Sequence, residues 1–239
     1  MQCYRPVHPV KALTFDLDDT LYNNEPIIQQ ADAALNQKIR NDYPALSAMT
    51  NDDWFTIKKA LINKNPKLAS DMGKLRWQTL FTALGKAQLP DTERAQAASE
   101  LFDFFYAARS DFQVEPDIIA VMEKLAEKVP LVAITNGNVD TDMIGLAPFF
   151  SLTLHASVTR PRKPYPDMFE EAIEHLSLPP QHIMHVGDNL IKDVLGAHKV
   201  GMQTAWLACN REMDLRTEKL AVLPGVQLSE LDELLLMVD

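Results

Sequence analysis

Two acidic residues stand close together near the start of the chain, directly after a short apolar run. Asp16 and Asp18 follow the run at residues 10–15, and Thr20 comes two positions later. A carboxylate at the end of an apolar strand is costly to bury unless a cation pairs with it. Alternate side chains of an extended segment project to the same side, and carboxylate oxygens are the ligands that Mg²⁺ prefers. The pair therefore indicates a magnesium site.

A calcium-binding loop and a plain acidic turn are the alternatives for this segment. The calcium loop requires glycine at its sixth position, because the chain turns sharply there. Counted from Asp16, that position is occupied by Leu21. The calcium loop is therefore excluded, and the acidic turn stays open as the simpler interpretation.

A second candidate follows the apolar run at residues 131–134. Thr135 closes this run, and Asn136 and Gly137 come next. A hydroxyl at the end of a strand, followed by glycine and free backbone N–H groups, can hold phosphate oxygens. An ordinary strand-to-turn junction has the same composition, so this segment does not establish a phosphate site by itself.

A third candidate is Lys163, which precedes Pro164 in the basic segment at residues 160–164. A cation held in a fixed position can neutralise the charge that develops on a phosphoryl group. A solvated basic loop is the alternative, and for Arg160 and Arg162 it is the simpler one unless they line the mouth of the site.

The fourth candidate follows the apolar run at residues 183–186. Asp188 comes directly after Gly187 and would supply the remaining carboxylate of the magnesium site. Asp193, one helical turn further on, could orient Lys163 or a metal-bound water. An acid stabilised by the positive end of a helix is an equally good interpretation of Asp193.

The elements that position these residues alternate between strand and helix. Short runs rich in Val, Ile and aromatic residues predict buried parallel strands at residues 10–15, 131–134, 183–186 and 204–207. Apolar stripes at helical spacing predict helices at residues 118–126 and 168–176. This alternation predicts an α/β fold with a doubly wound, mostly parallel sheet. Ligands of such sheets bind beyond the carboxyl ends of the strands, so the four candidates should converge.

A long helical segment interrupts this pattern after the first strand. Residues 25–109 carry apolar stripes at helical spacing, and Pro44, Pro66 and Pro90 mark the expected breaks between helices. We therefore predict that residues 1–21 and 111–239 form an α/β core. Residues 22–110 should form an all-helical insertion.

Composition limits the partners and the compartment. The 239 residues carry a formal net charge of -10, which disfavours nucleic acid and anionic membranes as main partners. An anionic substrate must then be caught by local positive charge or by a metal. The chain has two cysteines, and it shows neither a signal peptide nor an apolar run that could span a membrane. We expect a soluble, cytoplasmic protein. The six histidines show no metal-binding spacing, and His185 is expected to pack rather than to act in catalysis.

Taken together and in this order, the motifs resemble those of the haloacid dehalogenase superfamily: Asp-x-Asp-x-Thr, a strand-end Thr, a Lys, and Gly-Asp-x-x-x-x-Asp. The helical insertion resembles the cap of its subfamily I. The resemblance implies a Mg²⁺-dependent hydrolase of phosphate monoesters that acts through an aspartyl-phosphate on a small phosphorylated metabolite.

The resemblance also implies a role for each matched residue. Asp16 would be the nucleophile and a metal ligand, and Asp18 would be the acid and base, with its backbone carbonyl on the metal. Thr135, Asn136 and Lys163 would bind the phosphate, and Lys163 would also act in catalysis. Asp188 would complete the metal site, with Thr20, Asn189 and Asp193 in support.

Three other functions remain as alternatives. A dehalogenase releases halide without a proton and has no use for the carboxyl group of Asp18, so Asp18 favours phosphate. A phosphosugar mutase would reveal itself by an isomerised product. A non-catalytic binding protein is the third alternative, although every motif residue is present.

Within the superfamily, residues 12–22, 131–138 and 185–188 resemble bacterial flavin-pathway phosphatases. This resemblance implies 5-amino-6-(5-phosphoribitylamino)uracil or flavin mononucleotide (FMN) as the substrate. A sugar phosphate or a nucleotide is the alternative. Asn189 departs from that branch, which often has Asp there. Tyr22 is a candidate for stacking on the heteroaromatic ring, or else it packs at the hinge of the cap. The sequence indicates no oligomeric state.

Overall fold

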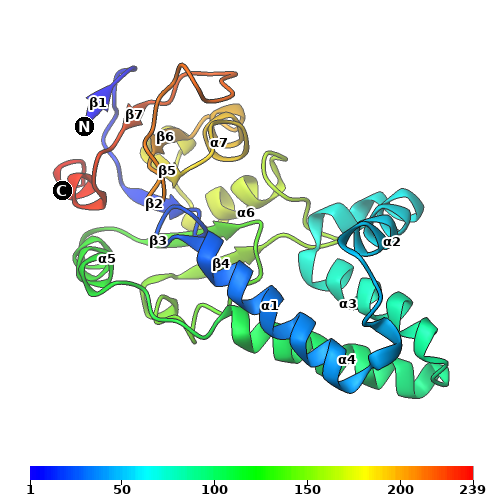
Figure 1. Cartoon of the computed structure of the whole chain (residues 1–239). Coiled ribbons are helices and arrows are strands. Elements are labelled where there is room, and N and C mark those ends of the chain that lie inside the picture. The colour runs from blue at the N-terminus through cyan, green and yellow to red at the C-terminus, as the bar shows by residue number, and fades with distance from the viewer. Residues whose placement is uncertain (239) are drawn as a thin grey trace.

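The computed structural model describes residues 1–238, and a seven-stranded sheet forms its centre (Figure 1). The sheet order is β1-β7-β6-β5-β2-β3-β4. Neighbouring strands run parallel, except that β1 is antiparallel to β7. The strands are β1 (Gln2–Cys3), β2 (Ala12–Phe15), β3 (Leu131–Thr135), β4 (Leu152–His155), β5 (Ile183–Gly187), β6 (Gln203–Trp206) and β7 (Val226–Gln227).

The four strands predicted from apolar runs are confirmed as β2, β3, β5 and β6, and so is the doubly wound α/β class. Every residue of β2, β3 and β5 is buried, which explains why their sequences are mostly apolar rather than alternating. The sequence analysis did not predict β1, β4 and β7. Two of these strands have only two residues, and three of the four residues of β4 are partly exposed.

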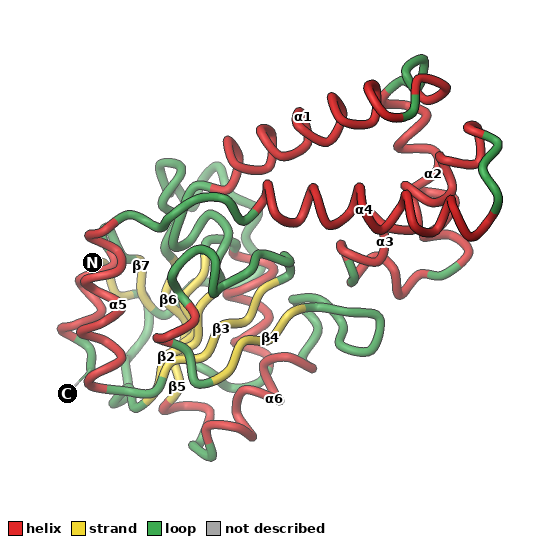
Figure 2. Tube along the Cα trace, turned by 90° about the horizontal axis from the view of Figure 1, so that it is seen from below, coloured by secondary structure: helices red, strands yellow, loops and turns green. Residues whose placement is uncertain are grey.

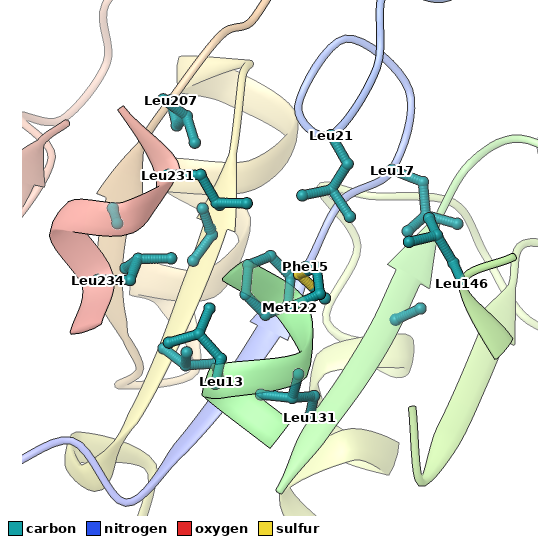
Figure 3. Close-up of a cluster of buried hydrophobic side chains, with 14 of the residues drawn as sticks. Leu13, Phe15, Leu17, Leu21, Met122, Leu131, Leu146, Leu207, Leu231 and Leu234 are labelled. Atoms are coloured by element: carbon teal, nitrogen blue, oxygen red, sulfur yellow. The ribbon is translucent and has the colours of Figure 1, made fainter. Parts of the chain in front are cut away.

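Helices cover both faces of the sheet. Met122 and Leu125 of α5 (Pro116–Lys128) pack on one face against Leu13, Phe15 and neighbouring residues (Figure 3). The other face is covered by α6 (Asp167–Leu176) and α7 (Gly196–Lys199). Both helical stripes predicted after position 110 therefore lie on the sheet.

Four helices between β2 and α5 extend away from the sheet (Figures 1 and 2). They are α1 (Asn24–Asp42), α2 (Asn51–Lys64), α3 (Met72–Ala83) and α4 (Asp91–Arg109). The predicted breaks are confirmed, since Pro44 and Pro66 begin short 3₁₀ turns and Pro90 precedes α4. These helices bury their own apolar cluster, which includes Leu35 and Leu101. The other 3₁₀ turns are Leu84–Ala87, Ala147–Phe149, Pro180–His182 and Leu231–Leu236.

The strand order determines where the motif residues meet. The central strand β2 pairs with β3 on one side and with β5 on the other. Asp16 therefore leaves the sheet between Thr135, at the end of β3, and Asp188, directly after β5. Parallel strands bring residues that are far apart in the sequence to one edge.

Within residues 1–238, no helix is both long enough and apolar enough to cross a membrane. The two cysteines, Cys3 and Cys209, are free and exposed.

The separate apolar core of the helical segment can be tested by mutation. Leu101 of α4 is 1% exposed within the apolar cluster of the four helices. Leu101→Ala should lower the free energy of unfolding by about 2–5 kcal/mol, because it leaves a cavity as well as removing buried methyl groups. Leu236→Ala, at a residue that is 80% exposed, should change it by less than about 0.5 kcal/mol. Urea unfolding of both variants measures the difference, and equal small effects would contradict the packing described above.

Candidate active site

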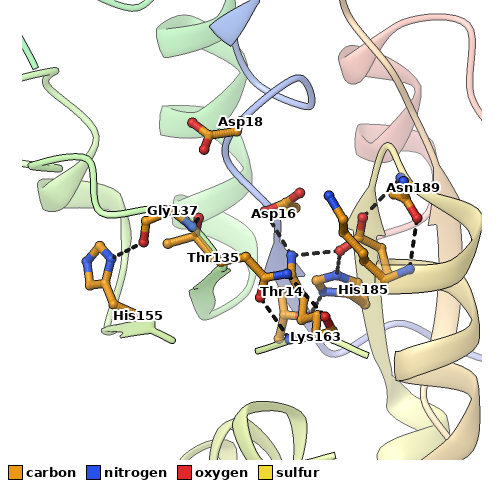
Figure 4. A network of polar contacts seen from close by, with 12 residues as sticks. Thr14, Asp16, Asp18, Thr135, Gly137, His155, Lys163, His185 and Asn189 are labelled. Atoms are coloured by element: carbon orange, nitrogen blue, oxygen red, sulfur yellow. Dashed lines mark hydrogen bonds and ion pairs between the residues drawn. The ribbon is translucent and has the colours of Figure 1, made fainter. Parts of the chain in front are cut away.

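A buried lysine links two carboxylates at the carboxyl edge of the sheet (Figure 4). Lys163 is 1% exposed, and its Nζ lies 2.8 Å from Oδ1 of Asp16 and 2.6 Å from Oδ1 of Asp193. Burial alone would lower the pKa of Lys163, but the charges of Asp16 and Asp193 raise it above its ordinary value. Lys163 is therefore held as a cation beside Asp16.

The backbone of Lys163 is fixed by Asn136. The Asn136 side chain accepts from the Lys163 N–H at 2.8 Å and donates to the Lys163 carbonyl at 3.2 Å. The sequence analysis assigned Asn136 to phosphate binding. In the structure its side-chain amide is already engaged, so its position favours a role in holding Lys163.

Three hydrogen-bond donors surround the Asp193 carboxylate. It accepts from Lys163, from Nε2 of His185 at 3.2 Å and from the backbone N–H of Asn189 at 3.0 Å. Burial opposes ionisation, yet Lys163 and then His185 hold the pKa of Asp193 well below its ordinary value. A β-carbon at Gly187 would overlap the Asp193 side chain, so this close approach requires glycine. Of the two interpretations of Asp193, the structure supports the one in which it orients Lys163.

Asn189 caps the next helical turn rather than facing the carboxylates. Its Oδ1 accepts from the backbone N–H groups of Ile191 and Lys192, which begin a π-helical segment at Leu190–Leu195. The expected support is thus local: Asn189 shapes the turn that carries Asp193. His185, expected to pack, is buried against Phe169, and it also contacts Thr14 at 2.8 Å.

Asp188 has a cationic partner that the sequence analysis did not identify. Nη1 of Arg211 lies 2.9 Å from Oδ2 of Asp188, and Nη2 donates to the Asp188 carbonyl. Trp206 also donates to that carbonyl at 2.7 Å. Burial, and then the charge of Asp193, raises the pKa of Asp188 to about 6, against the opposing effect of Arg211.

Three carboxylates form a cluster that fits a metal ion. One oxygen each from Asp16, Asp188 and Asp193 lies within 4.8 Å of the others. Burial raises the pKa of Asp16, and the charges of Asp193 and Asp188 raise it further, whereas Lys163 opposes this. A divalent cation with a preference for oxygen ligands would offset the repulsion. We expected the carboxylates of Asp16, Asp18 and Asp188 to cluster, but the third carboxylate in the structure is Asp193. The backbone carbonyl of Asp18 stays a predicted metal ligand.

The Asp18 carboxylate lies apart from this cluster (Figure 4) and has its own partners. Its Oδ1 accepts from the Tyr22 hydroxyl at 2.7 Å and lies 2.7 Å from Nη2 of Arg109. Its Oδ2 lies 2.5 Å from the point that a β-carbon at Gly137 would occupy. Asp18 is therefore free to act on a ligand without being a side-chain ligand of the metal.

Tyr22 does not contact the pocket. Its side chain packs tilted against Phe112, with ring centroids 4.8 Å apart, and the residue is 7% exposed. Burial, and then the charge of Asp18, raises the pKa of the Tyr22 phenol well above its ordinary value, so the hydroxyl remains a donor. Of the two roles considered for Tyr22, the structure supports packing at the hinge and contradicts stacking on a substrate ring.

Two threonines complete the site. Thr135 is fully buried at the end of β3, and its hydroxyl accepts from the backbone N–H of Gly137 at 2.9 Å. Thr20 is 1% exposed, and within residues 1–238 its hydroxyl has no hydrogen-bond partner. Thr135 thus borders the same glycine as Asp18, whereas the supporting role expected of Thr20 is not explained by a contact.

A pocket of about 450 Å³ lies between the helical segment and the sheet edge. It combines apolar and amide side chains with five cations, although the chain as a whole is acidic. The cations are Arg76, Arg109, Arg162, Lys163 and Lys192. The other lining residues are Asp18, Asn24, Ile28, Ala69, Met72, Phe105, Asn136, Gly137, Asn138 and Pro164. Arg76, Arg109 and Lys163 are paired with carboxylates, so Arg162 and Lys192 are the lining cations that have no ion pair among the described residues. These two supply local positive charge for an anionic ligand.

Three arginines of this region, Arg76, Arg109 and Arg211, were not predicted from the sequence. Arg76 stacks on Phe105 at 3.4 Å and pairs with Asp32 at 2.8 Å, so that it forms part of the pocket wall. Arg109 is the last residue of α4, where a cation is ordinarily explained by the helix dipole. The only feature of the sequence that could have indicated Arg109 is its position shortly after the aromatic stretch at residues 104–106.

The contact between Gly187 and Asp193 leads to a prediction. Gly187→Ala should displace the Asp193 carboxylate from Lys163 and lower the free energy of unfolding by about 1–3 kcal/mol, as overpacking does. Gly73→Ala is the matched control, because its nearest neighbour to a new β-carbon is 3.5 Å away and alanine favours a helix. Thermal unfolding and a crystal structure of each variant provide the measurement. An unshifted Asp193 in Gly187→Ala would show that the contact is not as tight as described.

Two known proteins are similar to this chain over nearly its whole length. The chain is 35% identical over 234 residues to the 5-amino-6-(5-phospho-D-ribitylamino)uracil phosphatase YigB of Escherichia coli, covering 98% of each. It is 25% identical over 237 residues to a glyceraldehyde 3-phosphate phosphatase of Methanopyrus kandleri, covering 95% of this chain and 96% of the other.

Solved structures agree with the fold. This chain is similar to the crystal structure of a 2-haloacid dehalogenase from Pseudomonas syringae, with a TM-score of 0.87 and 31% sequence identity. The match covers 95% of this chain and 97% of the dehalogenase chain. The family model of the haloacid dehalogenase-like hydrolases matches residues 10–201. These residues include every motif described above, and the chain belongs to the haloacid dehalogenase-like hydrolase family.

Proposed function

We propose that this protein hydrolyses phosphate monoesters, with Asp16 as the nucleophile and an aspartyl-phosphate as the intermediate. The observation that carries the proposal is the buried Lys163 between Asp16 and Asp193, beside a pocket rich in cations. An anionic nucleophile and an anionic phosphate repel each other, so fixed positive charge at the point of attack is the main requirement. The relatives named above support the enzyme class expected from the sequence, a phosphoric monoester hydrolase.

The reaction divides into two displacements at phosphorus. In the first, a carboxylate oxygen of Asp16 bonds to phosphorus while the bond to the ester oxygen breaks. Asp18 gives its proton to that oxygen, since an alkoxide is too basic to leave alone. In the second, water bonds to phosphorus, its proton passes to Asp18, and the bond to Asp16 breaks. Lys163 and the Thr135 hydroxyl would bind the phosphoryl oxygens throughout.

Two carboxylates of the cluster, Asp16 and Asp188, would hold Mg²⁺. The third, Asp193, is already engaged by Lys163, His185 and the Asn189 N–H, and the backbone carbonyl of Asp18 is the further ligand that the family resemblance implies. When bound, Mg²⁺ would supply positive charge that offsets the charge of the phosphate. We also propose that residues 22–110 act as a cap, because they contribute one wall of the pocket. A small phosphorylated metabolite is the proposed partner, and a cytoplasmic location stays a prediction.

Metal dependence should be measurable both in the rate of hydrolysis and in the melting temperature of the protein. Removal of metal with EDTA should abolish hydrolysis, and Mg²⁺ should restore it. Mg²⁺ should also raise the melting temperature of the metal-free protein, because a ligand of the native state stabilises it. The rise should disappear in Asp188→Asn and persist in Asp103→Asn, which removes an exposed carboxylate of α4. Full activity in metal-stripped protein would contradict the proposed metal site.

The proposed substrate is 5-amino-6-(5-phosphoribitylamino)uracil, FMN or both. The support is the similarity to the Escherichia coli enzyme, together with a pocket that is much larger than a phosphate group. Because Tyr22 packs at the hinge, the ring must meet other cap residues. Arg76, which is stacked on Phe105, offers N–H donors to ring carbonyls, and Met72 offers an apolar contact.

The dehalogenase from Pseudomonas syringae keeps a second candidate function open. Displacement of a halide needs a carboxylate nucleophile but no proton donor for the leaving group. This chain places Asp18 beside the pocket and holds it with two side chains, which favours an ester whose leaving oxygen requires a proton.

Steady-state kinetics on a panel of substrates tests the function and the substrate together. The ribitylaminouracil phosphate or FMN should have a higher kcat/KM than a hexose phosphate, and a 2-haloacid should not be turned over. Met72→Ala should weaken this preference, since Met72 is 48% exposed on the pocket wall. Met143→Ala, which removes a comparably exposed methionine elsewhere, should not. A clear preference for the hexose phosphate would refute the flavin-pathway substrate, and turnover of the haloacid alone would refute the phosphatase.

A further inference from the structure

The carboxylate of Asp18 is held at one oxygen by two donors from different parts of the chain. The Tyr22 hydroxyl donates to Oδ1 at 2.7 Å, and Nη2 of Arg109 lies 2.7 Å from the same oxygen. On the other side, Oδ2 lies against the bare backbone of Gly137, where any side chain would collide with it. The two oxygens of Asp18 are therefore in different environments.

Both donors are too deeply buried to be incidental surface partners. The Arg109 side chain is 3% exposed, and its Nη1 is buried without a hydrogen-bond partner in the described residues. Its Nη2 contacts the Asp18 carboxyl group, so the position of this side chain is fixed beside Oδ1. The Tyr22 ring is fixed against Phe112, which aims its hydroxyl at Asp18.

The two donors also stand at the two connections between the sheet and the helical segment. Tyr22 comes two residues before α1 begins, and Arg109 is the last residue of α4. These two helices run side by side away from the sheet (Figures 1 and 2) and pack against each other. The orientation of Asp18 therefore depends on how both helices join the sheet.

We propose that Tyr22 and Arg109 are positioning residues that keep Oδ1 of Asp18 occupied and leave Oδ2 as the oxygen that carries the transferred proton. The inference rests on the proposed phosphatase function. In the first displacement the proton passes from Oδ2 to the leaving oxygen as its bond to phosphorus breaks. In the second, the proton of the attacking water passes to Oδ2 as the water oxygen bonds to phosphorus. Loss of either donor would let the carboxyl group rotate and misplace this proton.

Tyr22→Phe tests the inference with the least disturbance, because it removes the hydroxyl and keeps the ring on Phe112. In the first turnover, release of the alcohol from an alkyl phosphate such as FMN should slow by about ten- to a hundredfold, the effect of losing a hydrogen bond to a charged group. First-turnover release of 4-nitrophenolate from 4-nitrophenyl phosphate should change by less than about twofold, since this leaving group needs little protonation. The first turnover is measured because the second displacement is common to both esters. Tyr4→Phe is the matched control, because it removes a hydroxyl that donates to Gln227 at 2.8 Å far from the site.

A double-mutant cycle separates positioning from a general structural effect. In an Asp18→Asn background, Tyr22→Phe should cause no further loss on the alkyl phosphate, because the group through which it acts is gone. Arg109→Lys should retain more of this activity than Arg109→Met, and thermal unfolding should verify that each variant is folded.

Three outcomes decide the matter. A selective loss on the alkyl phosphate that vanishes in the Asp18→Asn background supports the inference. Equal slowing of the first turnover of both esters by Tyr22→Phe, or an additive loss in the double variant, overturns it. If the wild-type protein hydrolyses neither ester, the proposed function fails first, and this result is distinct from a failure of the positioning role.

Discussion

A buried ammonium group between two carboxylates is the interaction on which the rest of the site depends. Lys163 has almost no access to water, so its charge is tolerable only because Asp16 and Asp193 compensate it. Much of the surrounding structure serves to bring these three groups together. Asn136 fixes the Lys163 backbone, and Gly187 makes room for the Asp193 side chain. The sheet supplies the third condition, because its central strand ends directly before Asp16.

The same arrangement resolves a conflict between the charge of the whole chain and that of its proposed substrate. The chain carries a net charge of -10, and three carboxylates meet at the sheet edge. Phosphate would be repelled from such a place without local compensation. Arg76 and Arg109 come from the helical segment, whereas Arg162, Lys163 and Lys192 come from the segments that follow β4 and β5. The pocket therefore takes its cations from both parts of the chain. The Asp18 carboxylate lies outside the carboxylate cluster, because the Tyr22 hydroxyl and the Arg109 guanidinium hold it.

The sequence predicted the features whose signals are local. Apolar runs located the strands that carry the motifs, prolines located the breaks between helices, and the motif spacing located Asp16, Lys163 and Asp188. Contacts between distant residues could not be predicted in this way. Arg109 lies 91 residues from Asp18, and its position at a helix end already had a sufficient explanation. The side-chain roles of Asn136 and Tyr22 depend on what surrounds them in three dimensions, which no spacing rule describes.

The central claim is that Asp16, held beside Lys163, forms a covalent bond to phosphorus. Rapid acid quenching during turnover of FMN, followed by peptide mass spectrometry, tests it most directly. We predict a phosphorylated peptide with the modification on Asp16, which should be absent in Asp16→Asn. With 4-nitrophenyl phosphate in place of FMN, it should accumulate in Asp18→Asn, because that leaving group needs little protonation and only the second displacement is slowed. Turnover without any phosphorylated peptide, or phosphate on another residue, would contradict the account.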